Sequence, residues 1–208
     1  QHIETQHCVA TINNGTKETK LWNRLHGCGD LPALVFANGT KQWYKNGKRH
    51  RNHDLPAIEW ANDNKEWWKN GEQHRDNDLP AVEWADYGKE WYKNGLKHRD
   101  NDLPAIELTD GSKSWWKNGD RHRDHDLPAI EFFNGSKMWF KNGLFHRDHD
   151  LPAIELVNCR KEWWQHGIRH RENWLPAIIY SDGKCEWWVN NYKYERDAVI
   201  LLSKQNKM

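Results

Sequence analysis

Histidine and aspartate recur together in one short segment of the chain, and this pairing is the first pattern that could do chemistry. In three copies the segment carries two histidines and an aspartate, at His50, His53 and Asp54, at His122, His125 and Asp126, and at His146, His149 and Asp150. Imidazole and carboxylate groups side by side are ligands that zinc takes in proteins. The pattern therefore allows zinc in some copies only, because asparagine replaces the second histidine in the others.

The same residues also have a structural interpretation. The first histidine of a copy, such as His98, would pack on Trp91 and donate a ring N–H to a nearby carboxylate or carbonyl. We favour this interpretation and expect no cofactor, with zinc as the alternative. Asp100 and Asp102 look like a fragment of a calcium loop, but Leu-Pro follows them and no glycine lies close, which argues against calcium.

The tryptophans are the second group that could bind a ligand. A row of indole rings could stack sugar rings, or bases with the help of arginine. Equivalent tryptophans on an uninterrupted period are more typical of a core, so carbohydrate binding is the alternative. The expected core of the repeat consists of Trp43, His50, Trp67, His74, Trp91, His98, Trp115, His122, Trp139, His146, Trp163 and His170.

Catalysis is not expected. An active site needs a unique nucleophile with a base and an orienting group. Here every notable residue recurs in several copies, and serines such as Ser112 and Ser136 have no repeated His-Asp partner at a distinctive place. The chain also has no glycine-rich phosphate loop. These observations predict a protein that is not an enzyme.

These residues recur because the chain is a tandem repeat. Shifting it by 24 residues superposes the tryptophans, the first histidines and all seven prolines, from Pro32 to Pro176. No insertion breaks this register, so each unit must meet its neighbours in the same geometry. We expect one repeat domain over 1–208, with a degenerate cap at 1–30, regular repeats at 31–184 and a second cap at 185–208.

Composition narrows the partners. The 31 basic and 30 acidic residues leave a formal charge of +1, so no bulk field attracts nucleic acid or anionic lipid. No apolar run is long enough to span a membrane. The 15 tryptophans argue against disorder despite 29% charged residues.

The four cysteines lack zinc-knuckle spacing and are expected to be free, with a bridge between Cys159 and Cys185 as the alternative. The chain opens at Gln1, which leaves N-terminal processing open.

Local signals predict an all-β fold. Asn-Gly pairs such as Asn46-Gly47 lie between extended segments and favour two-residue hairpins, which would pair Lys45 with Lys48 and Tyr44 with Arg49. Each unit should hold three short strands that continue as one meandering sheet in an open, elongated array. Asp102 should accept backbone N–H groups in an Asx-type turn.

Counting along one unit predicts its two faces. The count places Ile58 beside Trp67 and His74 on one face of the sheet. It places Glu59 beside Glu66 and Arg75 on the other. One face would therefore be aromatic and the other charged.

The unit, written Gly-x-Lys-x-Trp-(Trp/Tyr)-Lys-Asn-Gly-x-x-His-Arg-x-x-Asp-Leu-Pro-Ala, resembles the divergent MORN-type hairpin repeats found in giant DNA viruses of amoebae and in some bacteria. The Trp-x-x-x-Gly portion, as in Trp91 to Gly95, carries the likeness, whereas the His-Arg-x-x-Asp-Leu-Pro-Ala half departs from the standard repeat. The resemblance implies stacked β-hairpins and a role as scaffold, binding surface or virion component.

We therefore expect a non-enzymatic scaffold or protein-binding surface, intracellular or virion-associated. The alternative is a binder with repeated sites, for metal through histidine and aspartate or for carbohydrate through tryptophan. The sequence names neither the protein partner nor the oligomeric state, and it predicts no nucleic-acid partner.

Overall fold

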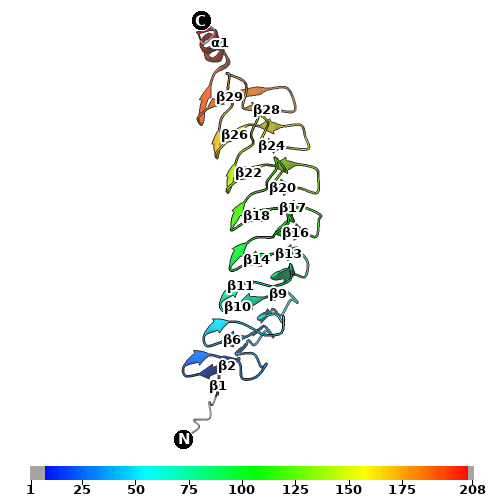
Figure 1. Ribbon diagram of the computed structural model, residues 1–208, viewed down its shortest axis with the longest axis vertical. Coiled ribbons are helices and arrows are strands. Elements are labelled where there is room, and N and C mark those ends of the chain that lie inside the picture. The colour runs from blue at the N-terminus through cyan, green and yellow to red at the C-terminus, as the bar shows by residue number, and fades with distance from the viewer. Residues whose placement is uncertain (1–7, 206–208) are drawn as a thin grey trace. The chain divides into compact units, whose positions relative to one another are not determined.

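The computed structural model describes residues 8–205, whose regular secondary structure consists of short β-strands and one helix (Figure 1). The chain divides into two compact units, unit 1 at residues 1–100 and unit 2 at 101–208. In each unit the repeats form successive layers of short antiparallel strands, and the described strands close no barrel. The prediction of an all-β, open array of hairpin repeats is confirmed.

One run of paired strands, which we call the sheet ladder, passes through the layers of each unit. In unit 1 its strands are β1 (Val9–Asn13), β2 (Thr16–Leu21), β4 (Leu34–Val35), β5 (Lys41–Gln42), β8 (Ile58–Glu59), β9 (Lys65–Glu66), β12 (Val82–Trp84) and β13 (Gly88–Glu90). In unit 2 they are β16 (Ile106–Leu108), β17 (Lys113–Ser114), β20 (Ile130–Glu131), β21 (Lys137–Met138), β24 (Ile154–Glu155), β25 (Lys161–Glu162), β28 (Ile178–Ile179) and β29 (Cys185–Val189).

The remaining strands form separate hairpins, one per layer, on the side of the layer opposite the sheet ladder (Figure 1). In unit 1 they are β3 (Arg24–Leu25), which pairs with β2, then β6 (Tyr44–Lys45) with β7 (Lys48–Arg49), β10 (Trp68–Lys69) with β11 (Glu72–Gln73), and β14 (Tyr92–Lys93) with β15 (Leu96–Lys97). In unit 2 they are β18 (Trp116–Lys117) with β19 (Asp120–Arg121), β22 (Phe140–Lys141) with β23 (Leu144–Phe145), β26 (Trp164–Gln165) with β27 (Ile168–Arg169), and β30 (Tyr192–Tyr194), which pairs with β29.

The expectation of three strands per unit in one meandering sheet was wrong. Only two strands of each repeat join the sheet ladder, because the second extended segment changes partners at the tryptophan. Trp67 donates its backbone N–H to Ala81 O of the next repeat at 2.8 Å, while its carbonyl accepts from His74 N at 3.1 Å. The chain thus leaves the sheet at Trp67 and enters the hairpin.

The hairpins themselves formed as predicted. Tyr44 pairs with Arg49 and Lys45 with Lys48, around a loop in which Asn46 has φ 52° and Gly47 has φ 81°. Successive hairpins are also bonded to one another, since Gly71 N donates to Arg49 O at 2.8 Å. A two-residue loop with both φ values positive matches the twist of its strands, and this is why the register could be counted from the sequence.

The predicted register across the first turn was wrong by one residue. Ile58 pairs with Glu66 and Glu59 with Lys65. The turn is a three-residue loop closed by Trp60 N donating to Asn64 O at 3.0 Å, with Asp63 at φ 65°. Because side chains alternate along a strand, this single residue moves Glu66 to the inner face and Lys65 to the outer face.

The outer face of the sheet ladder is a row of alternating charges. Glu59 lies between Lys41 and Lys65, and Glu83 pairs with Lys65 and Lys89. In unit 2 the row runs Glu107, Lys113, Glu131, Lys137, Glu155 and Lys161. Opposite charges across strands stabilise the register by about 0.2–1 kcal/mol per pair.

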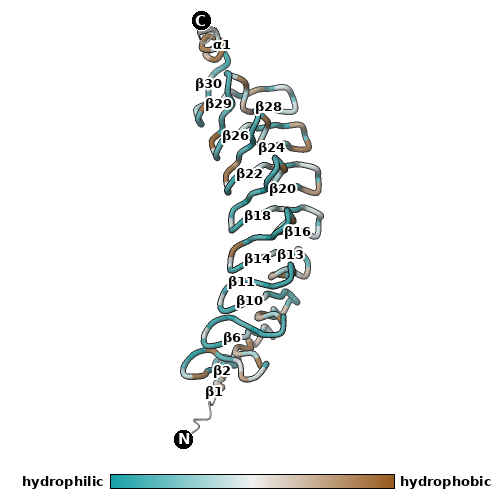
Figure 2. Tube along the Cα trace, viewed as in Figure 1, coloured by the Kyte–Doolittle hydropathy of each residue, from teal (hydrophilic) through white to brown (hydrophobic). Residues whose placement is uncertain are grey.

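The interior is narrow and built from small and aliphatic residues. The alanine after each proline is fully buried, and Ile58 and Val82 are 1% exposed. Most of the Cα trace is hydrophilic, with short hydrophobic segments that recur from layer to layer (Figure 2). Each layer therefore buries only a few side chains and depends on its neighbours to cover them.

The two ends of the described chain depart from the repeat. Cys8 and Cys28 are joined by a disulfide, so the expectation of four free cysteines was wrong. These two residues lie in the degenerate first repeat, where the period offers no guide to pairing. Cys159 and Cys185 are free thiols.

At the other end the chain forms the helix α1 (Arg196–Gln205), which the sequence analysis did not anticipate. Its Val199 is buried, and Val199 N donates to Glu195 O at 3.1 Å. Over residues 8–205 no helix combines the length and the apolarity needed to cross a membrane.

Candidate functional site

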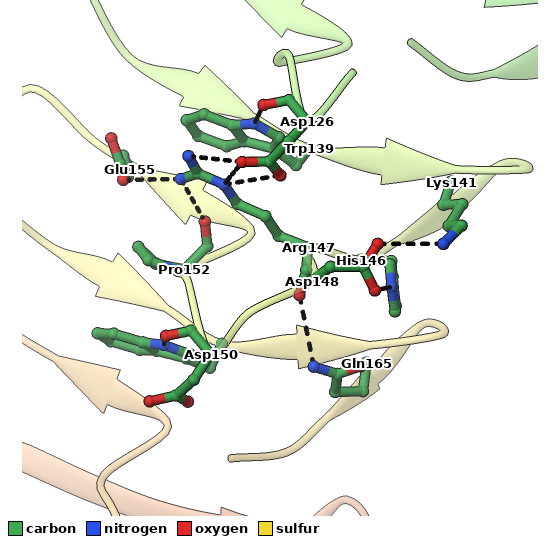
Figure 3. Close-up of polar contacts among 11 residues, drawn as sticks. Asp126, Trp139, Lys141, His146, Arg147, Asp148, Asp150, Pro152, Glu155 and Gln165 are labelled. Carbon is green, nitrogen blue, oxygen red and sulfur yellow. Dashed lines mark hydrogen bonds and ion pairs between the residues drawn. The ribbon is translucent and has the colours of Figure 1, made fainter. Parts of the chain in front are cut away.

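The segment from the recurring histidine to the recurring proline, such as residues 146–152, carries most of the candidate residues, and we call it the connector. Its arginine covers the tryptophan of the same repeat. Arg147 Cζ lies 3.7 Å from the centroid of the Trp139 ring, and Trp139 Nε1 donates to Asp126 O at 3.0 Å (Figure 3). The same stack recurs at Trp43, Trp67, Trp91, Trp115 and Trp163, and all six tryptophans are 5–6% exposed. A covered indole face is not available to a sugar ring.

The connector arginine also joins three consecutive parts of the array. Arg75 forms two bonds of 2.9 Å with the carboxylate of Asp54 in the preceding connector. Its remaining nitrogen donates to Pro80 O at 3.3 Å and to Glu83 of the following sheet strand at 3.1 Å. The planar guanidinium suits such forked contacts. Figure 3 shows the same arrangement around Arg147, with Asp126, Pro152 and Glu155 as acceptors.

The connector histidine uses both ring nitrogens within the protein. His74 Nδ1 accepts a bond from Asn94 N of the next hairpin at 3.1 Å, and His74 Nε2 contacts Asp76 Oδ1 at 2.9 Å. A backbone N–H can only donate, so the ring proton must be on Nε2, which donates to Asp76. The inter-repeat bond recurs at His26, His50, His122, His146 and His170.

The aspartate two residues after the histidine has a lowered pKa. Bonds from Lys93 and then His98 lower the pKa of Asp100 to about 2. Bonds from His122 and then Lys117 lower the pKa of Asp124 to about 2. These carboxylates are ionised over the ordinary pH range. Each accepts a hydrogen bond from Nε2 of the histidine ring.

The second histidine of the candidate metal set has a conformational role. His53, His125 and His149 each have φ 62°, and the following Asp54, Asp126 and Asp150 have φ 53–54°. The turn is closed by Leu55 N donating to Asn52 O at 3.3 Å. Asn77, at the equivalent position, has φ 61°. Asparagine, aspartate and histidine tolerate left-handed backbone better than most residues, so His and Asn interchange here.

The candidate metal ligands are not brought together. His50, His122 and His146 use Nδ1 to accept a backbone N–H, and Asp54, Asp126 and Asp150 accept arginine. Within residues 8–205 no three His, Cys, Asp or Glu side chains converge as a metal site would require. The expected Asx-type role of Asp102 was also wrong, because its carboxylate accepts from Arg123 at 3.1 Å.

A buried carboxylate is the main feature that the sequence analysis missed. Glu66 is 6% exposed and accepts from Trp60 Nε1 and Trp68 Nε1, both at 2.9 Å, and from Gln73 Nε2 at 3.2 Å. Glu162 occupies the same place in unit 2 and contacts Arg160. The predicted register placed Glu66 on the outer face. Its burial follows only when the turn is known to contain three residues.

Small polar cavities recur between neighbouring connectors. In unit 2 a cavity of 230 Å³ is lined by residues that include His122, His125, Lys141 and Asp148. In unit 1 the equivalent cavity measures 160 Å³ and is lined by His26, Lys45 and Asn52 among others. Several of these groups already pair with one another, as Lys141 does with Asp148 at 3.1 Å.

Comparison of the sequence with protein-family models finds no match, and comparison with curated proteins finds none either. The resemblance to MORN-type repeats therefore stays a prediction.

Proposed function

We propose that this protein is a non-enzymatic repeat scaffold that binds a protein partner along its connectors. The supporting observation is that the connectors expose the same leucine, which follows an arginine-paired aspartate in every connector of the row but the last, where Trp174 precedes it. The stripe, which we call the leucine row, consists in unit 1 of Leu55 and Leu79 and in unit 2 of Leu103, Leu127, Leu151 and Leu175, each 38–40% exposed. A surface that repeats a half-exposed apolar side chain at a constant interval suits a partner with several equivalent contacts.

The chemistry around the leucine row fits a binding surface better than a reactive site. The guanidinium of Arg123 is shared between Asp102 and Glu131, and Arg147 is likewise shared between Asp126 and Glu155. Polar groups that are already paired form a rim around an apolar contact without a large desolvation cost. Several weak contacts within one unit then add through avidity.

Affinity capture with a matched pair of variants tests the proposal. Substituting Leu127, Leu151 and Leu175 with serine removes the leucine row from most of unit 2. Substituting Phe133 and Val157, which are 70% and 63% exposed on the turns between sheet strands, is the control. Partners from the natural source should be retained by the wild type and the control and lost from the leucine variant. Equal retention by both variants would contradict the proposal.

A second candidate rests on the equivalent cavities between connectors. A binder with repeated sites would take one ligand per cavity, so its stoichiometry would follow the number of repeats. Elemental analysis of the purified protein tests metal, and a glycan screen tests carbohydrate. The narrower role of virion component comes from the MORN-type resemblance, and mass spectrometry of purified virions would test it.

A further inference from the structure

Two strand edges lack a strand partner in the described chain, and they lie at the two ends of the repeats. Strand β1 pairs with β2 along its whole length, and no described strand pairs with its other edge. Residues Cys185 and Glu186 of β29 pair with β28 on one side only, whereas their equivalents Lys161 and Glu162 are flanked by β24 and β28. Unpaired edges are templates for pairing with another chain.

The edge at β1 has none of the usual features that prevent such pairing. Its sequence Val9–Asn13 contains no charged residue and no proline, and all five residues are exposed, with Ile12 at 73%. By contrast, the inner strands of the ladder carry lysine or glutamate on their outer face. Natural edge strands are commonly protected by charge, proline or a bulge.

The edge at β29 borders a cavity. It has a volume of 860 Å³, and residues Tyr180, Cys185, Glu186, Trp187, Tyr194 and Arg196 line it. In the inner layers the next repeat supplies the strand that lies against the equivalent residues. There, Trp163 N donates to Ala177 O at 2.8 Å, and Lys161 and Glu162 pair with Ile179 and Ile178. The cavity therefore lies where an inner layer would receive the first strand of the following repeat.

We propose that β1 of a second copy of this chain pairs antiparallel with β29 and continues the sheet ladder from one copy into the next. The internal register specifies how the two edges meet. On β2, Lys17 pairs with Ile12 and Glu18 with Thr11, as Lys161 pairs with Glu155 and Glu162 with Ile154 on β25. Strand β1 thus occupies the place of β24, whose other neighbours are Lys137 and Met138.

Equivalent positions in the repeats identify which residues of the two copies lie opposite each other. Lys137 and Met138 are the counterparts of Cys185 and Glu186, so Ile12 of the second copy lies opposite Cys185, and Thr11 lies opposite Glu186. Ile12 and Cys185 replace the Glu–Lys pair of the inner layers, which leaves no unmatched charge on the outer face. Thr11 brings a hydroxyl to Glu186. The backbone groups also fit. Asn13 and Thr16 flank the two-residue loop as a hydrogen-bonded pair, and such pairs alternate along the hairpin, so Ile12 and Lys17 are a non-hydrogen-bonded pair. The N–H of Ile12 therefore points away from β2, toward the unpaired edge.

Site-specific cross-linking tests this register. The Ile12→Cys variant, oxidised with diamide, should form an intermolecular disulfide between Cys185 and the new thiol, and Cys185→Ser should abolish it. Exposed Cys159 is an internal control for random collisions. Peptide mapping should find residue 12 joined to Cys185 far more often than to Cys159. Equal yields of the links to Cys185 and to Cys159, or no intermolecular link to Cys185, would overturn the proposal. The second result is expected if α1 or a foreign strand occupies this edge.

Proline substitution tests the backbone contact. Ile12→Pro removes the outward N–H and leaves the bonds between β1 and β2 in place, whereas Ile12→Thr keeps the N–H and is the control. The average mass in light scattering should rise with concentration for the wild type and for Ile12→Thr, and should stay at one copy for Ile12→Pro. A wild type that stays at one copy, or a proline variant that assembles equally well, would refute head-to-tail pairing.

Discussion

The connectors and the turns between sheet strands lie in the same layers, yet they differ in how far their residues recur. The connector keeps histidine, arginine, aspartate, leucine and proline through nearly every repeat, whereas the turn reads Phe132-Phe133 in one layer and Leu156-Val157 in the next. The histidine, arginine and aspartate of the connector contact a neighbouring layer, as Arg147 contacts Asp126 and His146 contacts His166 N. The side chains of Phe133 and Val157 are largely exposed. Residues that join layers recur, and residues that only close a turn vary.

The turns also link layers through buried hydroxyl groups, which supports the same rule. Phe133 N donates to Ser112 Oγ at 3.0 Å, and Val157 N donates to Ser136 Oγ at 3.0 Å. Both serines are buried. The hydroxyl that accepts the bond therefore recurs in these layers, while the exposed donor residue changes from phenylalanine to valine.

The largest expected effect is a difference in stability between two variants. One removes a tryptophan that a connector arginine covers, and the other removes an exposed side chain of a turn. Trp139→Ala should destabilise the protein by about 3–5 kcal/mol, because it removes a buried ring and the platform of Arg147. Phe133→Ala should change stability by less than about 0.5 kcal/mol, because its ring is exposed. Denaturant midpoints measure both variants, and similar values for the two would remove the distinction between the regions.

Arg147→Lys tests whether connector charge or connector geometry links the layers. Lysine keeps the charge but loses the forked contacts and the planar stack, so we expect a loss of about 2 kcal/mol. A double-mutant cycle with Asp126→Asn should show coupling between the two residues. Additive effects in that cycle would mean that the arginine does not act through Asp126.

Two variants of His74 separate its two hydrogen bonds. Asparagine places an acceptor near the position of Nδ1, and glutamine places a donor near the position of Nε2. His74→Asn keeps the bond from Asn94 in the next layer and should be more stable than His74→Gln by about 1 kcal/mol. The opposite order in thermal melts would show that the bond to Asp76 matters more than the bond between layers.

Cys159→Gly, in the turn between β24 and β25, should stabilise the protein by about 0.5–1 kcal/mol. Cys159 has φ 67° at the position where Gly135 has φ 88°, and glycine adopts this conformation without the steric cost of a side chain. Gly135→Ala is the matched control and should destabilise. Thermal melts of the two variants should shift in opposite directions, and shifts of the same sign would count against backbone strain in these turns.

The smallest expected effect is a dependence on acidic pH. The pKa of Asp124 is lowered from 3.8 to about 2 in the folded state by His122 and Lys117. A lowered pKa contributes stability that is present above pH 3.8 and is lost as the pH falls toward 2. Because this carboxylate is exposed, the effect should be modest. Asp124→Asn should flatten the pH dependence of the melting temperature over this window, and an unchanged profile would contradict the role assigned to the ion pair.

Local features of the fold could be predicted because they depend on neighbours in sequence. The pairing of Tyr44 with Arg49 follows from Asn46-Gly47, whose backbone preferences close the hairpin by themselves. The repeat array follows from an unbroken period, which requires every layer to meet the next in the same way, and its openness follows from the degenerate repeats at both ends, which do not match each other as a closed ring would require. Predicting these features requires no knowledge of contacts between distant segments.

The positions of the candidate residues could not be predicted, because they depend on the number of residues in a turn and on partners in other layers. One residue in the loop after Trp60 decides that Glu66 is buried, since side chains alternate across a strand. Arg75 and Asp54 are 21 residues apart and meet only when two connectors stack. The sequence by itself therefore determined the repeat, its hairpins and its lack of closure. The tertiary structure alone decided which charges are buried, which arginine covers which tryptophan, and that Cys8 pairs with Cys28, because each of these contacts needs two segments brought together by folding.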